Sequence, residues 1–402
     1  MAAAAAVATR SVLAGDLRIE LFTDMRSAEK DWRRLETDNL NSLHQGFDWC
    51  DAWEKTHGHP LAIIRGSRDG KACFILPLEI QRHNMVRTAQ FIAARFNNIN
   101  TGLFSADFRE HCDVTGARAI AAALVTLLAG KADLIALQNI PLDWRGTRHP
   151  LSGLPATEHQ NHTFQLPLLS DMEATIRQVN AKRRRKKYRN QCRKLEAVGG
   201  FDHLIAHSDA EKRQLLELFF EQKAARFKAQ GLPNVFQAPE TQAFFQMLSE
   251  ADSGGGNVPL QLNAIRLKGK HDGKIAAIAG LSRKGDHVIC QFGSIDETLV
   301  PEASAGELLF WLMIEKSGAE GADLFDFGLG DQGYKRSWCT VETIQHDILL
   351  PVTSSGRLAA LAQRGLTRTK AAIKGNPHLY SLIQRLRAHA DNRPAPSDAD
   401  EA

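Results

Sequence analysis

The sequence of 402 residues lacks the short motifs that mark several large enzyme classes. Its six cysteines form no CxxC pair and its fifteen histidines include no HExxH sequence, so the usual ligand spacings of zinc sites are missing. It contains no GxSxG nucleophile elbow and no Walker phosphate loop. These absences exclude the best-marked classes of zinc enzyme, α/β-hydrolase and nucleoside triphosphatase.

Long apolar runs and a strong charge of one sign are also missing. No stretch reaches the roughly 18–20 apolar residues of a membrane span, and the Ala-rich start has no basic segment that would make it a secretory signal. The net charge of +4 does not by itself indicate a nucleic-acid binder. Because a chain of this length needs no disulfides, we expect reduced thiols and a cytoplasmic location.

What is present is the composition of a folded protein, with 43% hydrophobic and 24% charged residues. The length predicts two domains. Residues 123–140 and 308–330 share one order, which is an apolar helix, a glycine, Ala-Asp-Leu and a strand. We therefore expect two copies of one α/β unit, the second complete and the first reduced.

The pattern of strands, helices and breakers divides the chain into five parts. These are a disordered N-terminus (1–16), a first unit (17–168), a second unit (169–352), a basic helical appendage (353–390) and a disordered tail (391–402). In the second unit, apolar periodicity predicts helices over 171–197, 209–229, 239–250 and 305–317, and strands over 260–267, 274–283, 287–295, 323–328 and 341–350. Two further helices are expected over 357–373 and 377–388.

The stretch "DFGLGDQGYKRSW" (326–338) is the first candidate site. Ligands of open α/β sheets gather beyond the carboxyl ends of strands, and this is where Asp331, Tyr334 and Lys335 stand. Asp331 is a candidate general base or orienting group, and Lys335 is a candidate to neutralise a phosphate or an oxyanion. We expect both side chains to face one cavity. The alternative is an Asp that caps a helix and pairs with a Lys.

The stretch "SAGE" (304–307) opens the helix before that strand. Ser304 and Glu307 fit a capping box. The N–H groups of Ala305 and Gly306 are candidates to hold an anion at the helix start. The alternative is a capped, buried helix without a ligand, because Glu307 would repel a phosphate.

Two basic segments are further candidates. Residues 182–187 are six consecutive cations, and 178–191 contain no Asp or Glu. They form either a solvated helix or a contact for a polyanion, such as cofactor phosphates, tRNA, an anionic lipid headgroup or a polysaccharide intermediate. Lys223 and Arg226 lie one helical turn apart. They are candidates for substrate binding, or are solvated residues above an aromatic core face.

Several of these segments together resemble one family. "NAKRRRKKYRNQCRKLEAVGGF", "EQKAARFKAQGLPNVF", "AAIAGL" and "SAGELLFWLMIEKSGAEGADLFDFGLGDQGYKRSW" resemble, in order and spacing, the CelD/BcsL-type proteins. "GFDWCDAWEKTHG" and "ACFILPLEI" resemble the N-terminal half of that family, so the resemblance covers about residues 17–350. These proteins are bacterial acetyltransferases of the GNAT superfamily, are associated with cellulose biosynthesis and are related to the Fem-type aminoacyl transferases.

The resemblance implies an α/β (α+β) fold of tandem GNAT-like domains, the first degenerate, with the helical appendage at the C-terminal end. It implies acyl transfer from acetyl-CoA or another acyl-CoA to an amine or hydroxyl acceptor in cell-envelope or exopolysaccharide metabolism, without a metal. The implied catalytic residues are Asp331, Tyr334 and Lys335. The resemblance also places Arg184 and Arg185 on the basic helix of the family. Together with the residues argued above, the predicted cofactor-binding residues are Ser304, Ala305, Gly306, Arg184 and Arg185, and the predicted substrate-binding residues are Lys223 and Arg226.

One departure from the family pattern keeps two alternatives open. The GNAT pyrophosphate loop usually reads Gln/Arg-x-x-Gly-x-Gly/Ala, and here "PEASAGE" keeps only Gly306. The first alternative is a Fem-like transferase that takes its acyl group from aminoacyl-tRNA and binds the tRNA through residues 182–187. The second is a non-catalytic GNAT scaffold within a polysaccharide synthase system.

Overall fold

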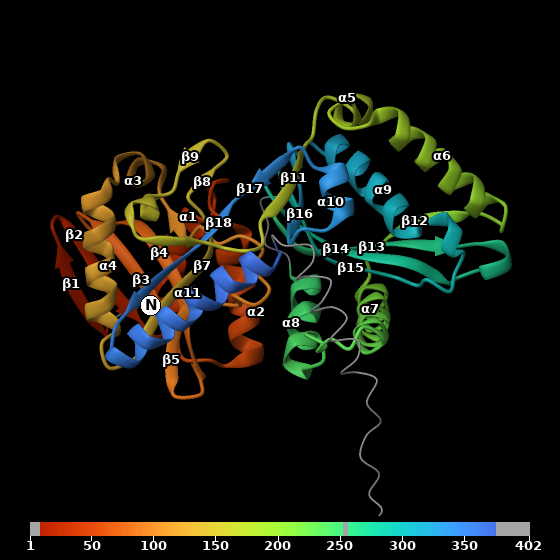
Figure 1. Ribbon diagram of the computed structural model, residues 1–402. Coiled ribbons are helices and arrows are strands. Elements are labelled where there is room, and N and C mark those ends of the chain that lie inside the picture. Colours follow the sequence, from red (N-terminus) through yellow and green to blue (C-terminus); the bar gives the residue numbers. More distant parts are fainter. Residues whose placement is uncertain (1–8, 252–255, 375–402) are drawn as a thin grey trace, which may run out of the picture.

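The computed structural model describes residues 9–251 and 256–374. It places two β-sheets side by side with helices on their faces, so the predicted mixed α/β fold is confirmed (Figure 1). The predicted helix over 377–388 and the tail over 391–402 lie outside the described residues. Within the described ranges, no helix combines the length and apolar character that crossing a bilayer requires.

The first sheet has nine strands in the described part of the chain. Its strands are β1 (Arg10–Ala14), β2 (Leu17–Phe22), β3 (Leu61–Arg68), β4 (Lys71–His83), β5 (Val86–Phe91), β6 (Leu103–Phe104), β7 (Leu134–Pro141), β10 (Ala156–Glu158) and β18 (Gln345–Pro351). Their order is β1-β2-β3-β4-β5-β7-β18-β10, with β6 beside β4. Its helices are α1 (Glu29–Leu35), α2 (Phe47–His57), α3 (Ala106–His111) and α4 (Val114–Leu128). A separate small ribbon joins β8 (Asp143–Trp144) to β9 (Thr147–Arg148).

The second sheet has seven strands in the described ranges, in the order β12-β13-β14-β15-β16-β11-β17. They are β11 (Thr163–Pro167), β12 (Phe201–Ile205), β13 (Val258–Leu267), β14 (Ile275–Lys284), β15 (His287–Ile295), β16 (Leu324–Leu329) and β17 (Val341–Thr343). The helices of this half are α5 (Met172–Arg177), α6 (Ala181–Glu196), α7 (Asp209–Ala229), α8 (Pro239–Glu250), α9 (Ala305–Ala319) and α10 (Gly333–Trp338). The chain ends its described part in α11 (Ser354–Lys374).

The two halves contain the same unit. In the first sheet, β5 and β7 are parallel neighbours with α4 between them in the chain. In the second, β15 and β16 are parallel neighbours with α9 between them. The two segments that share a sequence order, 123–140 and 308–330, therefore occupy equivalent places in the two sheets.

Two strands cross between the halves. β11 falls within the range expected for the first unit but pairs with β16 and β17 in the second sheet. β18 falls within the range expected for the second unit but pairs with β7 and β10 in the first sheet. Figure 1 shows β18 in blue beside β7 and β11 in yellow-green beside β16. Each sheet is thus completed by the other half, which the predicted division at residue 168 does not capture.

A single aromatic core lies between the two halves. Helices α1 and α2 of the first half and α7 and α8 of the second pack into it, and α2 contacts α8 directly. The rings of Trp49 and Phe244 meet edge to face with centroids 5.2 Å apart, and those of Phe219 and Phe292 stack at 4.1 Å. The outer face of the first sheet packs on α4, and that of the second on α6 and α9.

Local boundaries differ from the predictions at two places. Residues 10–14, expected within a disordered N-terminus, form β1 because they pair antiparallel with β2 through a short turn at Gly15 and Asp16. The single helix expected over 171–197 is broken between α5 and α6. The break arises because the Asn180 side chain accepts a hydrogen bond from the Arg183 N–H at 3.1 Å, which starts a new helix.

The helix predicted over 357–373 is present as α11 and covers the end of the first sheet. Its small residues Ala359 and Ala360 pack against Leu134, Ala136 and Leu349. Successive residues of a strand point to opposite faces. Ile135 and Leu137, which alternate with Leu134 and Ala136 on β7, accordingly face the core under α4.

Docking of α11 depends on a glycine. A Cβ atom on Gly356 would lie 1.7 Å from the Asp133 carbonyl oxygen, whereas one on Gly365 would meet nothing within 4 Å. We expect Gly356→Ala to lower the free energy of unfolding by about 2 kcal/mol and Gly365→Ala to raise it by about 0.5–1 kcal/mol. Urea denaturation measures both. Equal stability of the two variants would contradict the described packing of α11.

Candidate active site

The parallel strands β15 and β16 separate after a short stretch of pairing. Their register joins His287 to Leu324, Val288 to Phe325 and Ile289 to Asp326, and no further pair follows. A cavity of about 540 Å³ lies where the strands diverge, with residues 290–295 of β15 on one side and Phe327 and Leu329 of β16 on the other. Backbone groups that would normally pair across two strands thus border a space for a ligand.

The cavity collects most of the residues predicted for the site. Ser304, Gly306, Lys223, Arg226, Tyr334 and Lys335 line it. Ala305, Arg184, Arg185 and Asp331 are not among the lining residues. Residues that the sequence did not single out complete the walls, including Asn98, Cys290, Gln291 and Phe310.

Lys335 is a buried cation in the wall of the cavity. Only 4% of its surface is exposed, and its Nζ donates to the carbonyl oxygens of Gly328 at 3.0 Å and Leu329 at 2.9 Å. An ammonium has three N–H donors, so one remains for a bound group. Burial lowers the pKa of the Lys335 ammonium.

Tyr334 stands next to Lys335 on α10. Its ring stacks on Phe310 with centroids 5.5 Å apart and meets Phe327 edge to face at 6.3 Å. Partial burial among these rings raises the pKa of the Tyr334 phenol. The hydroxyl therefore stays protonated at neutral pH and is a proton donor rather than a base.

The predicted substrate residues Lys223 and Arg226 reach the cavity from α7. The Nζ of Lys223 lies 5.8 Å from the ring centroids of both Phe219 and Phe227. Burial, and to a smaller extent Arg226, lower the pKa of the Lys223 ammonium. Three cations therefore border the cavity, counting Lys335, which favours a ligand with negative charge.

The start of α9 is not the capping box that the sequence predicted. Ser304 has a φ of 51° and its side chain makes no cap hydrogen bond, because an N-cap serine needs an extended backbone. The Glu307 carboxylate instead accepts from Arg184 Nη1 at 2.6 Å and pairs with Lys187. Two cations therefore neutralise the charge that was expected to repel a phosphate from this helix start.

Arg184 and Arg185 occupy structural positions. Arg184 is 6% exposed, donates to Ser337 Oγ at 2.7 Å and lies 3.8 Å above the Trp338 ring, so it ties α6 to α9 and α10. Arg185 forms an exposed pair with Glu173 at 2.7 Å. Neither guanidinium borders the cavity, unlike the cofactor contact that the family resemblance implies.

Asp331 also lies apart from the cavity. Its two carboxylate oxygens accept from Arg336 Nε at 2.6 Å and Nη2 at 3.0 Å. The expectation that Asp331 and Lys335 face one cavity is therefore wrong. The helix α10 begins only at Gly333, so the two side chains do not share the helical face that their spacing predicted.

The floor of the cavity comes from both halves of the chain. Asn98, in a loop of the first half, donates through Nδ2 to Gln291 Oε1 at 2.8 Å and accepts from the Leu329 N–H at 3.0 Å. His44 of the first half contacts the same Gln291 oxygen through Nε2 at 3.2 Å. Complete burial lowers the pKa of His44 to about 4, so the ring is neutral at pH 7.

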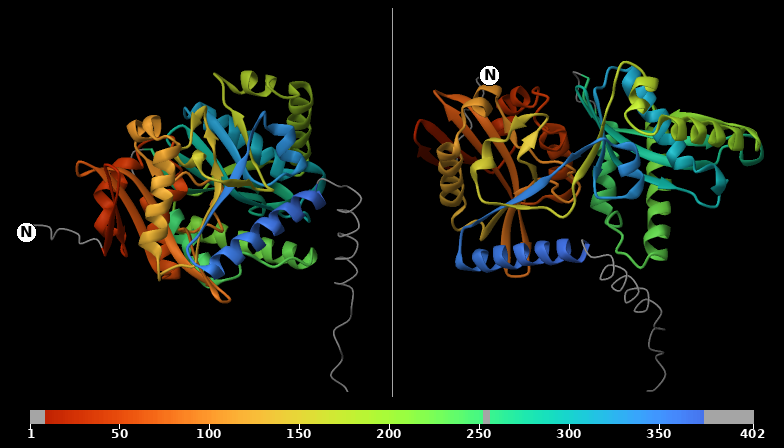
Figure 2. Two further views of the ribbon diagram at one scale, coloured as in Figure 1. Left: turned by 60° about the vertical axis from the view of Figure 1, so that its left-hand side comes forward. Right: turned by 45° about the horizontal axis from the view of Figure 1, so that its top comes forward.

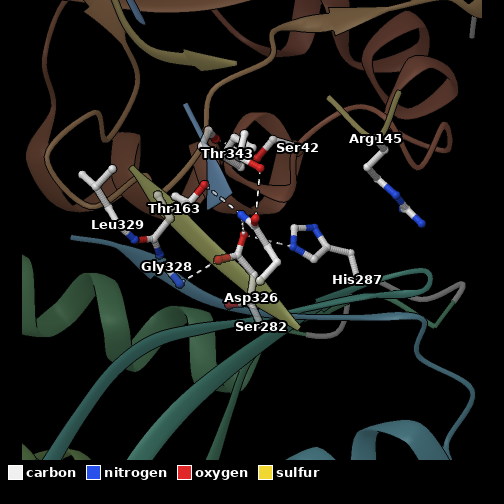
Figure 3. A network of polar contacts seen from close by, with 12 residues as sticks. Ser42, Arg145, Thr163, Ser282, His287, Asp326, Gly328, Leu329 and Thr343 are labelled. Carbon is white, nitrogen blue, oxygen red and sulfur yellow. Dashed lines mark hydrogen bonds and ion pairs between the residues drawn. The ribbon is translucent and has the colours of Figure 1, made fainter. Parts of the chain in front are cut away.

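Beneath the floor, a buried carboxylate shapes the turn that holds Lys335. Asp326 is completely buried and accepts from the Gly328 N–H at 2.7 Å and from Gln165 Nε2 at 3.2 Å, while His287 Nε2 lies 3.4 Å away (Figure 3). Gly328 has a φ of 74°, and a Cβ there would lie 2.7 Å from Asn98 Oδ1, so only glycine fits. Asp326 stands in the stretch that the sequence singled out, but its strand position gave no sign of this role.

A comparison with protein families matches residues 182–336 to the acetyltransferase (GNAT) domain. This part of the chain is a GNAT acyltransferase domain. It contains the diverging strands, the cavity and every lining residue named above except Asn98. A search of curated proteins found no match.

Several solved structures are similar to this chain over most of its length. The structure of FemX is 14% identical with a TM-score of 0.56, covering 80% of this chain and 96% of FemX. The C-terminal domain of a putative lysylphosphatidylglycerol synthetase from Agrobacterium fabrum is 11% identical with a TM-score of 0.49, covering 84% and 95%. A tandem GNAT protein from the clavulanic acid biosynthesis pathway is 10% identical with a TM-score of 0.44, covering 82% and 98%. At these identities the FemX likeness shows a shared fold.

The buried pair of Arg184 and Glu307 should stabilise the GNAT domain more than the exposed pair of Arg185 and Glu173. Glu307→Gln leaves a buried guanidinium without its counter-charge, and we expect a loss of about 2–4 kcal/mol in the free energy of unfolding. Glu173→Gln is the matched control and should cost less than about 1 kcal/mol. Urea denaturation of both variants makes the comparison, and a Glu307→Gln variant as stable as the control would contradict a structural role for Arg184.

Proposed function

We propose that the protein transfers an acyl group, with acetyl the first choice, from acyl-CoA to an amine or hydroxyl acceptor in the cavity between β15 and β16. The observation that carries this proposal is the divergence of these two parallel strands around about 540 Å³, with the start of α9 and three cationic side chains at its border. A thioester with a phosphate-bearing tail matches both the shape and the charge of such a space.

The start of α9 suits the phosphates of the donor. Ser304 and Gly306 line the cavity, and the first N–H groups of a helix have no partner within the helix. The N–H groups of Ala305 and Gly306 precede the Glu307 N–H, which donates to the Ser304 carbonyl at 3.0 Å. Because Arg184 and Lys187 neutralise Glu307, the helix dipole is free to favour an anion here.

Lys335 and Tyr334 are suited to stabilise the two negative charges that develop in the reaction, on the carbonyl oxygen and on the leaving sulfur. The acceptor nitrogen or oxygen attacks the thioester carbon and the carbon–sulfur bond breaks. The acceptor proton passes to water, and the leaving thiolate gains a proton. The remaining N–H of Lys335 is suited to hold the carbonyl oxygen as it becomes negative. The protonated Tyr334 hydroxyl is suited to give a proton to the leaving sulfur. Asp331, which pairs with Arg336, has no part in this assignment.

The acceptor belongs, in this proposal, to cell-envelope or exopolysaccharide metabolism. This part rests on the sequence resemblance to CelD/BcsL-type proteins, including the cellulose context. The cytoplasmic location rests on the cysteine usage and stays a prediction.

Calorimetry with acetyl-CoA, longer acyl-CoAs and free CoA tests the donor. We expect binding that Gly306→Leu abolishes, because a side chain at Gly306 would enter the space occupied by Ile295 at the cavity wall. Gly318→Leu, on the same helix with nothing within 4 Å, is the matched control and should bind normally. Absence of binding by the unchanged protein at millimolar donor would refute the proposal and favour the non-catalytic scaffold.

The pH profile tests Lys335. Since burial lowers its pKa, the ammonium is present at low pH and is lost as the pH rises through a value below the usual 10.4 or so. Thioester cleavage should therefore fall on the alkaline side, and Lys335→Arg should shift that fall to higher pH because a guanidinium keeps its charge. Lys335→Met should lower kcat/KM by about 10²–10³-fold, while Asp331→Asn should keep most of the activity. An alkaline fall that persists in Lys335→Arg and moves in Lys223→Arg would assign the titration to Lys223 instead.

A second candidate, transfer from aminoacyl-tRNA, is favoured by the outer face of α6. Arg183, Lys186, Lys187, Arg189 and Arg193 line a shallow depression of about 520 Å³ there. Lys187 also contacts Glu307, which lines the cavity, so this cationic face continues to the site.

Binding of tRNA at several salt concentrations separates the two donors. If tRNA is the donor source, the variant Arg183→Gln, Lys186→Gln, Arg189→Gln should bind it more weakly and with a log Kd–log salt slope smaller by about 2–3. The control replaces three exposed lysines of the first half, namely Lys30, Lys55 and Lys71, by glutamine. Equal slopes for both variants would argue against a tRNA site on α6.

A further inference from the structure

Helix α11 exposes its leucine side chains to solvent and does not bury them against the first sheet. A surface helix normally buries its large apolar residues. The side of α11 that packs on the first sheet instead presents Gly356, Ala359 and Ala360. Leu358, Leu361 and Leu366 are 71%, 63% and 55% exposed.

These leucines form one stripe. At about 100° per residue, Leu358, Leu361 and Leu366 fall within an arc of about 140°, opposite Gly356 and Ala360. Exposed Ala362 and Gly365 lie within the same arc. Figure 2 shows α11 along the outside of the first half, away from α6. The stripe therefore faces away from the body of the protein over about two helical turns.

The charge of α11 has a single sign. Residues 354–374 include Arg357, Arg364, Arg368, Lys370 and Lys374 and no Asp or Glu. Arg357 is exposed at the edge of the leucine stripe. The nearby Asp133, against which the helix start packs, is already paired with Arg87 at 3.1 Å. The described cations Arg357 and Arg364, with no acidic residue in the sequence of α11, give this helix a positive charge beside its exposed leucines.

We propose that the outer face of α11 lies in the interface of an anionic lipid membrane, parallel to its surface. A basic helix with a leucine stripe buries the stripe at the boundary of headgroups and acyl chains, while its cations bind anionic headgroups. A second copy of the same face is disfavoured as the occupant because two copies of a helix whose sequence carries only positive charge would repel each other. This membrane contact is separate from the cavity. It goes beyond the proposed acyl transfer because it places that reaction at a membrane surface.

Vesicle flotation of the full-length protein tests the proposal. We expect the protein to bind vesicles of 30% phosphatidylglycerol and 70% phosphatidylcholine at least about 10-fold more tightly than vesicles of phosphatidylcholine alone. This affinity should decrease as the salt concentration rises. Leu358→Gln with Leu361→Gln should weaken binding by about 10–100-fold. Arg357→Gln should weaken it by about 5-fold and reduce the salt dependence.

A matched control keeps the test specific to α11. Leu13 and Met85 are exposed leucine and methionine side chains, at 76% and 81%, on other parts of the first half. Leu13→Gln with Met85→Gln should leave vesicle binding unchanged, and urea denaturation should show both double variants to be as stable as the unchanged protein. No flotation with anionic vesicles at low salt, or equal loss in the control, would overturn the proposal. A dimer seen by light scattering would also overturn it, if Leu358→Gln with Leu361→Gln dissociates that dimer and leaves vesicle binding unchanged. The stripe would then be a subunit interface.

Discussion

The exchange of β11 and β18 between the sheets is the constraint on which the cavity depends. β16 has to leave β15 to open a space, and β11 pairs with it on the other side. Gln165 of β11 also donates to Asp326, the carboxylate that fixes the turn at Gly328 and so the carbonyl that binds Lys335. On the other side, Gln345 of β18 donates to the Asn98 carbonyl at 2.9 Å, and Asn98 forms part of the floor. Each crossing strand thus positions one part of the site: β11 contacts the carboxylate next to the Gly328 turn, and β18 contacts Asn98.

The two units differ in what they do with the same strand geometry. β5 and β7 pair over three residue pairs, Thr88–Leu134 to Gln90–Ala136, as β15 and β16 do. In the first unit a loop then closes the gap, since the Asn100 N–H and side-chain amide donate to the carbonyls of Asn139 and Gln138 at 2.9 and 2.8 Å. The same loop carries Asn98 into the floor of the second unit. In the first unit, the loop thus forms the hydrogen bonds that the separated strand edge would otherwise lack. The same unit provides part of the cavity wall of the second unit.

Local patterns in the sequence predict local structure well and distant contacts poorly. The ranges expected for α7 and α8 agree with the structure because apolar spacing and end signals act within a few residues. The pattern Ser-x-x-Glu occurs at both Ser208 and Ser304, but only Ser208 forms a capping box with Glu211. Glu307 is drawn instead to Arg184, 123 residues away in the chain. Of the candidate site, Tyr334, Lys335, Lys223 and Arg226 were found from their position after a strand, from helical spacing and from family resemblance. Asn98, Gln291 and Asp326 were not, because their roles depend on contacts between the two halves.

The crossing strands also set the order in which this chain can fold as it is synthesised. The contact from the Asn139 N–H to Asp347 spans 208 residues, so the edge of β7 has no partner until the ribosome has passed β18. At about 5–20 residues per second, that interval is roughly 10–40 s. An unpaired edge strand is a template for pairing with other chains, and contacts so distant in sequence slow folding. The nascent first half is therefore an incomplete sheet for about half of translation, a state in which molecular chaperones have both the time and the exposed backbone to bind it.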